Sequence, residues 1–199
     1  MVRFNELQKD ALCEIFNISV SQAAGALNEI LQQKIRLTVP SVEICDTKTV
    51  VEYIDQTNDI CGISQRFQSD FDGHAVLIFP ENRSLELVRL MVGIDVPLDQ
   101  LTEMEQDALG EIGNIVLNSC LASLSDMFDQ QFECGIPQLI IGNSHSVLSG
   151  YSDNSVLILL QIKFIVGEDE LEGHILFVVN AQSLGSLLTS INKFLSGIN

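Results

Sequence analysis

The sequence predicts an α+β protein in which a unit of one helix, three strands and a second helix occurs twice, with pseudo-two-fold symmetry. One observation is a polar motif, D-x3-E-x2-N-x22-P, that the chain carries at two places 97 residues apart. Another is that strand-like segments and a shorter helix follow each copy in the same order. The copies comprise Asp10, Glu14, Asn17 and Pro40, and then Asp107, Glu111, Asn114 and Pro137. We expect two long helices packed on a central, mostly antiparallel sheet.

The length of the chain suits a single domain. Its 199 residues can bury one sizeable core, or two small halves that share a core. Residues 95–100, with Pro97, form the only linker-like segment, and because it is short the halves should pack closely. We therefore predict one domain over residues 1–199, built of two repeats at about 1–94 and 101–199.

The first half should begin with a long helix over residues 7–33, because its apolar residues recur at helical spacing. At roughly 100° per residue, the apolar residues of one face are Leu7, Ala11, Ile15 and Ile18. The Asp, Glu and Asn of the motif share a polar strip roughly 60° wide beside that face. Each copy thus holds a carboxylate and an amide one turn apart on a largely buried helix.

A strand should follow at residues 35–45, where Pro40 predicts an edge position or a bulge because proline cannot donate to the ladder. Residues 46–59 are polar with one apolar island, and their conformation stays open.

The first half should end in a hairpin and a short helix. Residues 60–68 and 75–79 indicate the two strands, which turn at residues 69–73. Ser84 is the predicted N-cap of a helix that reaches about Val92, and Gly93 ends it.

The second half should repeat this order. Thr102-Glu103-Met104-Glu105 has the signature of a capping box and should open the second long helix. Strands are expected at residues 136–146, 155–166 and 175–179, and a last helix at 183–195. Asp72-Gly73-His74 and Glu172-Gly173-His174 are predicted to occupy matching turns.

The charge of the chain excludes several classes of partner. The net charge is −17 and the pI about 4.2, whereas binding to nucleic-acid phosphates needs clustered Lys and Arg. Adhesion to anionic membranes is disfavoured for the same reason. The N-terminus lacks the apolar region of a signal peptide, and the longest apolar run, residues 156–166, is too short to span a bilayer. We expect a cytoplasmic protein.

The cysteines and histidines indicate structural roles. The five cysteines contain no C-x-x-C pair, and we expect reduced, mostly buried thiols at Cys13, Cys45, Cys61, Cys120 and Cys134. The histidines lack the spacing of metal ligands and lie at positions His74, His145 and His174. No metal is expected to be held by this chain, so a metal-dependent hydrolase is disfavoured.

Most hydrolase chemistries lack their residues here. The chain has no G-x-S-x-G elbow and no P-loop. Cys61 and Arg66 are one residue too close for the C-x5-R loop of cysteine phosphatases. Asp70-Phe71-Asp72 resembles an aspartate nucleophile motif, but its position before a strand favours a turn. The paired Glu and Asn remain.

A carboxylate alone would repel a phosphoryl group. The pair can act only on a partner that brings the phosphate, a metal ion and a lysine. The carboxylate would then pair with the lysine, and the amide would hold a water in line for attack, as a glutamine does in GTPases.

At these residues the sequence resembles the CheC/CheX/FliY phosphatases of bacterial and archaeal chemotaxis, whose signature is an acidic residue or Ser, then Glu, Asn and a distant Pro. Both copies match, and the second has the familiar Glu-Ile-Gly-Asn-Ile form at residues 111–115. Two complete copies in a chain of this length make CheC the nearest member. The resemblance implies dephosphorylation of the aspartyl phosphate of a CheY-type response regulator, which supplies its own Mg²⁺ and lysine. Some members also bind the receptor deamidase CheD.

The resemblance also implies roles for the motif residues. The Glu of each copy, Glu14 and Glu111, would anchor the regulator, and the Asn, Asn17 and Asn114, would position the water. The supporting positions are Asp10 and Asp107 on the helix surface, and Pro40 and Pro137 in the strand beside the site. Ser21 and Asn118, one turn further, have no paired identity and are assigned to the surface.

Two alternatives stay open at this point. Phe16 stands where the second copy has Gly113, and its ring either hinders docking at the first site or belongs to the core. The protein as a whole is either this phosphatase or a non-catalytic module that docks a receiver domain or CheD.

Overall fold

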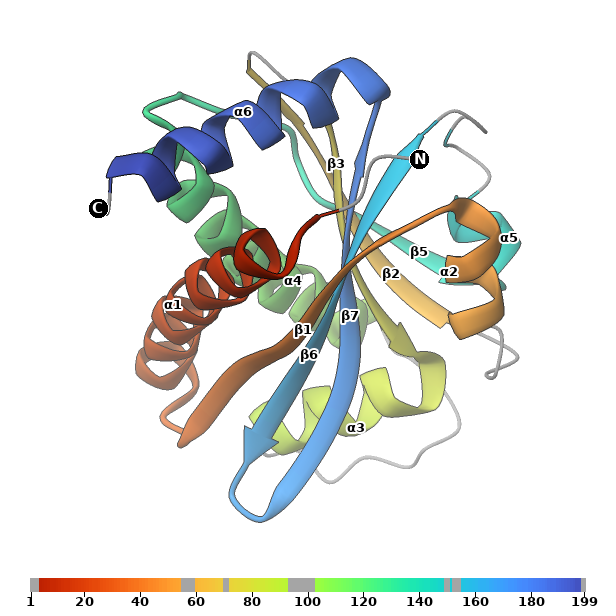
Figure 1. Cartoon of the computed structure of the whole chain (residues 1–199). Coiled ribbons are helices and arrows are strands. Elements are labelled where there is room, and N and C mark those ends of the chain that lie inside the picture. Colours follow the sequence, from red (N-terminus) through yellow and green to blue (C-terminus); the bar gives the residue numbers. More distant parts are fainter. Residues whose placement is uncertain are drawn as a thin grey trace.

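The computed structural model describes residues 4–54, 60–69, 72–92, 103–148, 151 and 155–197. Within them, antiparallel strands form one sheet, and the long helices α1 (Glu6–Leu31) and α4 (Glu103–Phe128) pack together on one of its faces (Figure 1). This arrangement confirms the predicted α+β fold class and the two long helices. None of the described helices combines the length and the apolar character needed to cross a membrane.

The described sheet has seven strands in the order β1-β6-β7-β3-β2-β4, and β5 also pairs with β2. The strands are β1 (Ile35–Cys45), β2 (Ile60–Gln68), β3 (Gly73–Pro80), β4 (Glu133–Cys134), β5 (Gln138–Gly142), β6 (Val156–Val166) and β7 (Asp169–Val179). The remaining helices are α2 (Thr47–Ile54), α3 (Glu81–Val92), α5 (Ser144–Leu148) and α6 (Ala181–Gly197). The strands predicted at 35–45, 60–68, 75–79 and 155–166 are therefore confirmed, and so are the first and last helices.

Strand β1 forms one edge of the sheet, as Pro40 predicts. Its pairing with β6 also shifts register between Thr38 and Ser41, so the proline lies in an irregularity as well. The backbone of Val39 and Pro40 has no partner on β6 at this point, and other groups must satisfy it.

The edge strands are exchanged between the two halves of the sequence. β1 of the first half pairs with β6 of the second, and β5 of the second half pairs with β2 of the first. Ser41 pairs with Gln161 and Gln138 pairs with Ser64, so the two pairs correspond after the same shift of 97 residues that relates the motifs. The division into two repeats stays a prediction, and this correspondence supports it.

The structure corrects the predicted start of the short helix and the predicted strand at 136–146. Helix α3 begins at Glu81, directly after Pro80, whose fixed φ suits the start of a helix. Ser84 lies inside the first turn, and its Oγ donates to the Glu81 carbonyl. Strand β5 ends at Gly142, and the Val147 N–H donates to the Asn143 carbonyl as the chain turns into α5.

The two Gly-His segments do not occupy matching turns. Gly73 begins β3, whereas Gly173 lies inside β7 opposite Ile162, because β7 starts at Asp169, well before the predicted residue 175. A Cβ at Gly173 would lie 2.5 Å from the Phe79 ring, so close packing and not a turn requires this glycine.

Several predicted features fall outside the described residues. These are part of the turn at 69–73, Gly93, the linker at 95–100 and the cap at Thr102. The segment 46–59, for which the sequence predicts no particular conformation, contains helix α2, whose first turn is capped where the Thr49 N–H donates to the Asp46 carboxylate.

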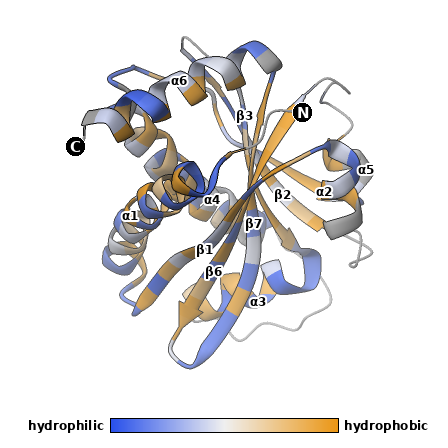
Figure 2. Ribbon diagram, in the orientation of Figure 1, coloured by the Kyte–Doolittle hydropathy of each residue, from blue (hydrophilic) through white to orange (hydrophobic). Residues whose placement is uncertain are grey.

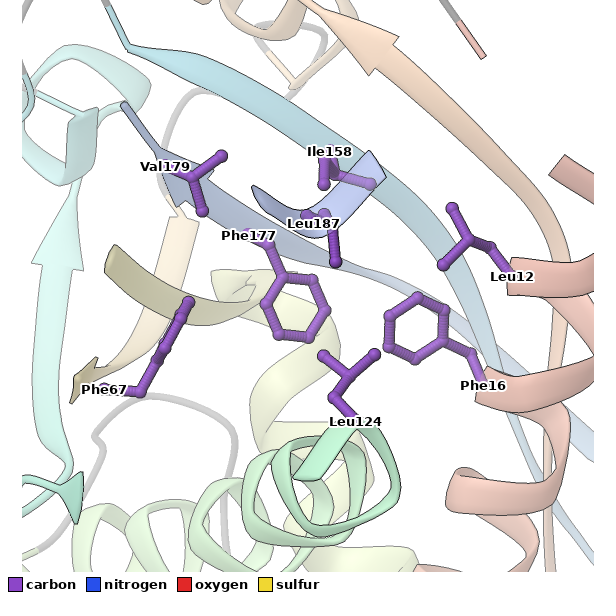
Figure 3. Close-up of a pocket in the computed structure, with 8 residues that line it drawn as sticks. All are labelled: Leu12, Phe16, Phe67, Leu124, Ile158, Phe177, Val179 and Leu187. Atoms are coloured by element: carbon purple, nitrogen blue, oxygen red, sulfur yellow. The ribbon is translucent and has the colours of Figure 1, made fainter. Parts of the chain in front are cut away.

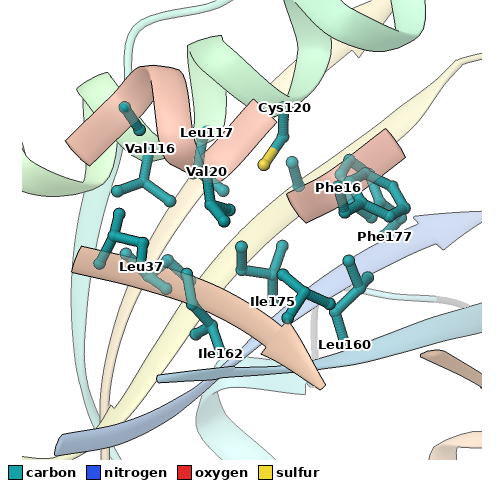
Figure 4. Close-up of a cluster of buried hydrophobic side chains, with 14 of the residues drawn as sticks. Phe16, Val20, Leu37, Val116, Leu117, Cys120, Leu160, Ile162, Ile175 and Phe177 are labelled. Atoms are coloured by element: carbon teal, nitrogen blue, oxygen red, sulfur yellow. The ribbon is translucent and has the colours of Figure 1, made fainter. Parts of the chain in front are cut away.

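The hydrophobic core lies on both faces of the sheet. The larger cluster lies beneath α1, α4, α3 and α6, and the smaller one beneath α2 and α5. Figure 4 shows α1 and α4 pointing side chains such as Val20 and Leu117 toward Ile162 and Ile175 of the sheet. The strands are accordingly largely hydrophobic, whereas the tip of the β6–β7 hairpin is hydrophilic (Figure 2).

Phe16 and Gly113 both face the core, which settles the difference between the two motif copies at this position. Phe16 is 2% exposed and stacks on Phe177 with ring centroids 5.3 Å apart, beside an apolar cavity of about 10 Å³ (Figure 3). A Cβ at Gly113 would lie 2.6 Å from Ile63 Cγ2. Helix α1 therefore meets the sheet through a ring, and α4 meets it through close backbone contact.

Candidate active site

The two motif copies lie on the solvent-facing sides of α1 and α4, which pack against each other. The carboxylates at both copies are exposed, and both asparagines are half-buried. Helix α1 is secured at its start by a capping box between Asn5 and Gln8, and the buried residues beneath the motif hold it on the sheet. Each copy thus presents a free carboxylate beside an amide that the protein interior can hold in place.

Asn17 is held by the backbone of β1. Its Nδ2 donates to the Cys13 carbonyl at 2.8 Å and to the Val39 carbonyl at 2.9 Å, and its Oδ1 accepts from the Val39 N–H at 2.8 Å. Val39 is the residue before Pro40, where the ladder to β6 is interrupted. The amide therefore satisfies the backbone groups that the irregularity leaves unpaired, which gives the separation of Asn and Pro in the motif a physical meaning.

Asn28, further along α1, binds the backbone of β1 in the same way. We call such a pair of bonds from one amide side chain to the N–H and C=O of one strand residue a clamp. Its Nδ2 donates to the Ile35 carbonyl at 3.2 Å, and its Oδ1 accepts from the Ile35 N–H at 2.6 Å. Two asparagine side chains thus tie α1 to β1, which keeps the motif helix and the strand in register.

Asn114 is held differently, by other side chains. Its Oδ1 accepts from Asn118 Nδ2 at 2.7 Å, and Asn118 Oδ1 accepts from Gln65 Nε2 at 2.9 Å. Ile136, which precedes Pro137 as Val39 precedes Pro40, is 88% exposed. Within the described part of the chain, Asn114 makes no bonds to a strand backbone like those of Asn17 to Val39. The two copies therefore share residues but not the means of fixing the amide.

Within the described part of the chain, Glu14 and Glu111 form no ion pair and no hydrogen bond. Lys9, on the same helix as Glu14, is paired with Glu43 at 3.3 Å and with Glu6 at 3.6 Å, and the hydrogen bond to Glu43 raises its pKa. The described residues also contain no group of three His, Cys, Asp or Glu placed to hold a metal ion. The exposed carboxylates are available for a basic group on a partner.

The cysteines are free thiols, and their burial is uneven. Burial raises the pKa of Cys61 to about 11 and that of Cys120 to about 12, so both stay protonated and unreactive at neutral pH. Cys13 and Cys45 are half-buried, and Cys134 is exposed. The expectation of mostly buried thiols is therefore wrong for Cys134 and holds fully for two of the five.

An apolar groove borders the first copy. Leu7 is 63% exposed and Ile18 is 52% exposed, although the helical pattern placed both on one apolar face with the buried Ile15. Together with Phe194 and Leu195 of α6 they line a groove of about 580 Å³ that reaches Glu14. An exposed carboxylate beside exposed apolar side chains suits the docking of another protein.

Sequence reasoning missed three residues of the site and misassigned one of them. Asn118, assigned to the surface, is half-buried and bonded to Asn114. No sequence pattern pointed to Gln65 or to the backbone of Val39. In the sequence, Gln65 is a polar residue at the alternating position that Ile63 and Phe67 also occupy, and Asn118 lies one turn after Asn114.

Comparison with known proteins assigns the chain to a family. The model of the CheC-like family matches residues 7–44, and that of the chemotaxis phosphatase CheX matches residues 60–161, just over half of the chain. The chain belongs to the CheC/CheX/FliY family of chemotaxis phosphatases. Each matched segment contains one complete motif copy.

Named relatives and solved structures agree with this assignment. The CheY-P phosphatase CheC of Bacillus subtilis is 24% identical over 201 residues, covering 96% of both chains. The flagellar motor switch phosphatase FliY of the same organism is 25% identical over 168 residues, covering 82% of this chain and 44% of that protein. The structure of Thermotoga maritima FliY superposes with a TM-score of 0.80 at 23% identity, over 98% of this chain and 100% of that one.

More distant structures share the fold. The FliM middle domain from H. pylori has a TM-score of 0.67 at 14% identity, over 94% of this chain and 99% of that one. A complex of CheX with CheY, BeF3 and Mg²⁺ from Borrelia burgdorferi matches with a TM-score of 0.50 at 12% identity, over 84% and 96% of the two chains.

Proposed function

We propose that this protein dephosphorylates the aspartyl phosphate of a CheY-type response regulator. The observation that carries the proposal is an exposed Glu one turn from an amide of fixed orientation, present on both α1 and α4. The relative in B. subtilis that covers nearly the whole chain is named a CheY-P phosphatase, and the distant CheX structure contains CheY.

The proposed reaction needs little covalent chemistry from this chain. The regulator brings the acyl phosphate with its Mg²⁺ and a lysine, so no metal is required of the phosphatase. Glu14 or Glu111 pairs with that lysine, and the amide of Asn17 or Asn114 holds a water opposite the aspartyl oxygen. The water oxygen bonds to phosphorus as the bond from phosphorus to the aspartyl oxygen breaks, which releases inorganic phosphate and restores the aspartate. Such catalysis rests on positioning.

The two asparagines retain different capacities for holding water. Both Nδ2 hydrogens of Asn17 are used by backbone carbonyls, which leaves a second lone pair on Oδ1 as an acceptor. Asn114 uses one lone pair of Oδ1, and its Nδ2 donates to none of the described residues. An acceptor for a water proton remains at both sites, and a donor for a phosphoryl oxygen remains at the second.

A second candidate function is docking without catalysis, with a receiver domain or CheD as the partner. The clamp on Val39 favours it for the first copy, because the clamp by itself accounts for Asn17. The exposed apolar side chains beside Glu14 suit docking equally well.

The deciding experiment measures the decay of phosphorylated CheY with the wild-type protein and with Asn17→Ala, Asn114→Ala and the double variant. Binding to the regulator is measured for each. We expect the wild-type protein to speed the decay of phosphorylated CheY. The double variant should lose this effect but still bind the regulator. Unchanged decay despite binding would replace the phosphatase with the docking module.

A further inference from the structure

The second copy contains a chain of side-chain amides that ends on a backbone carbonyl. Gln65 of β2 is 2% exposed, and its Nε2 donates to the Gly135 carbonyl at 3.1 Å as well as to Asn118 Oδ1 at 2.9 Å. Asn118 Nδ2 then donates to Asn114 Oδ1 at 2.7 Å. Three amides are thus connected in series from the sheet to the motif.

The carbonyl at the start of this chain determines the orientation of every amide in it. A backbone carbonyl can only accept, so Gln65 must turn its Nε2 toward Gly135. That nitrogen can only donate, so Asn118 must turn its Oδ1 toward Gln65 and its Nδ2 toward Asn114. Asn114 consequently keeps its Oδ1 toward Asn118 and its Nδ2 free to turn elsewhere.

We propose that Gln65 and Asn118 are positioning residues, which determine the atom that Asn114 presents to the attacking water. This proposal rests on the phosphatase function proposed above. Stability alone does not account for Gln65, because its buried Oε1 has no hydrogen-bond partner among the described residues and an unpaired buried oxygen is unfavourable.

Among the residues that the structure describes, the first copy has no equivalent series of side-chain amides. The position that corresponds to Asn118 is Ser21, whose Oγ donates to the Asn17 carbonyl, and the position that corresponds to Gln65 is the buried Ile162. Asn17 is oriented by Val39 instead. Substitution of Gln65 should therefore affect the second site alone.

The kinetic test uses Gln65→Leu and Asn118→Asp in an Asn17→Ala background, where only the second site can act. Leucine removes both donated bonds at similar volume, and aspartate removes the donor to Asn114 while it keeps the acceptor for Gln65. We expect kcat for dephosphorylation of CheY to fall on the order of 10- to 100-fold with KM unchanged, because a misdirected group costs rate and not docking. Gln68→Leu, at an exposed glutamine of the same strand, is the matched control and should change neither constant.

A double-variant comparison separates positioning from general damage. In an Asn114→Ala background, Gln65→Leu should cause no further loss, because the residue through which it acts is gone. A further loss there, or a change confined to KM, would overturn the positioning role.

A spectroscopic measurement tests the amide series from Gln65 to Asn114 without the reaction. In the protein alone, NMR should show that Gln65→Leu shifts the side-chain amide signals of Asn114 and Asn118, which are assigned by their loss in the corresponding alanine variants. Gln68→Leu should leave them in place. Unchanged Asn114 signals in Gln65→Leu would overturn the proposal. If the wild-type protein fails to speed decay, the phosphatase function falls, and the NMR result alone decides whether Gln65 orients Asn114.

Discussion

At the scale of single residues, identical side chains serve different purposes in the two motif copies. Asn17 satisfies the backbone of a strand at an irregularity, and Asn114 ends a series of side-chain amides. The motif spacing matches the clamp in the first copy, because Asn17 contacts the residue before Pro40. The Asn of the first copy therefore has a structural role that does not depend on its proposed role in positioning water.

This difference predicts unequal losses of stability. Asn17→Ala leaves the N–H and C=O of the buried Val39 without partners, which should lower the free energy of unfolding by about 1–3 kcal/mol. Asn114→Ala removes one bond between half-buried side chains and should cost about 1 kcal/mol or less. Urea denaturation of both variants measures the two losses. Equal losses would show that the clamp contributes nothing specific.

At the scale of elements, the two motif helices lie on the sheet in different ways. Phe16 places an aromatic ring between α1 and β7, whereas Gly113 lets α4 approach β2 until no Cβ fits. The departure between the copies at this position concerns packing, since neither residue lies on the solvent-facing side.

Gly113→Ala tests the close contact of α4 with β2. The new Cβ would lie 2.6 Å from Ile63 Cγ2, so the helix or the isoleucine must move, and we expect the free energy of unfolding to fall by roughly 1–3 kcal/mol. Gly110→Ala, one turn earlier with open space around its Cβ, is the matched control. It should gain up to about 1 kcal/mol from helix propensity. Thermal or urea denaturation compares them, and a loss at both positions would contradict the contact.

At the scale of the whole molecule, the sheet is shared between the halves. The first half gives β1 to β6 of the second half, and the second half gives β4 and β5 to β2 of the first. A half by itself would expose the unpaired edges of β6 or β2 and the apolar residues above them. Because the two halves of the sequence share one sheet, we expect the chain to unfold as one cooperative unit.

We expect neither half to fold alone. Fragments of residues 1–94 and 101–199, produced separately, should lack dispersed amide NMR signals and cooperative unfolding, and mixing them should restore both. A cooperative transition in either fragment alone would contradict the dependence of each half on the other's strand.

The sequence by itself determined the features that local chemistry decides. Two motif copies at the same internal spacing predicted the two long helices. Pro40, which cannot donate to a ladder, predicted an edge strand or a bulge, and β1 has both features. The prediction of Ser84 as an N-cap was wrong, because serine caps many helices but α3 begins earlier, directly after Pro80. Tertiary structure alone decided the exchange of β1 and β5, the close contact of Gly113 with Ile63, and the series of amide hydrogen bonds from Gln65 through Asn118 to Asn114. Each of these contacts joins residues that are far apart in the sequence, and local sequence patterns do not predict which distant residues will meet.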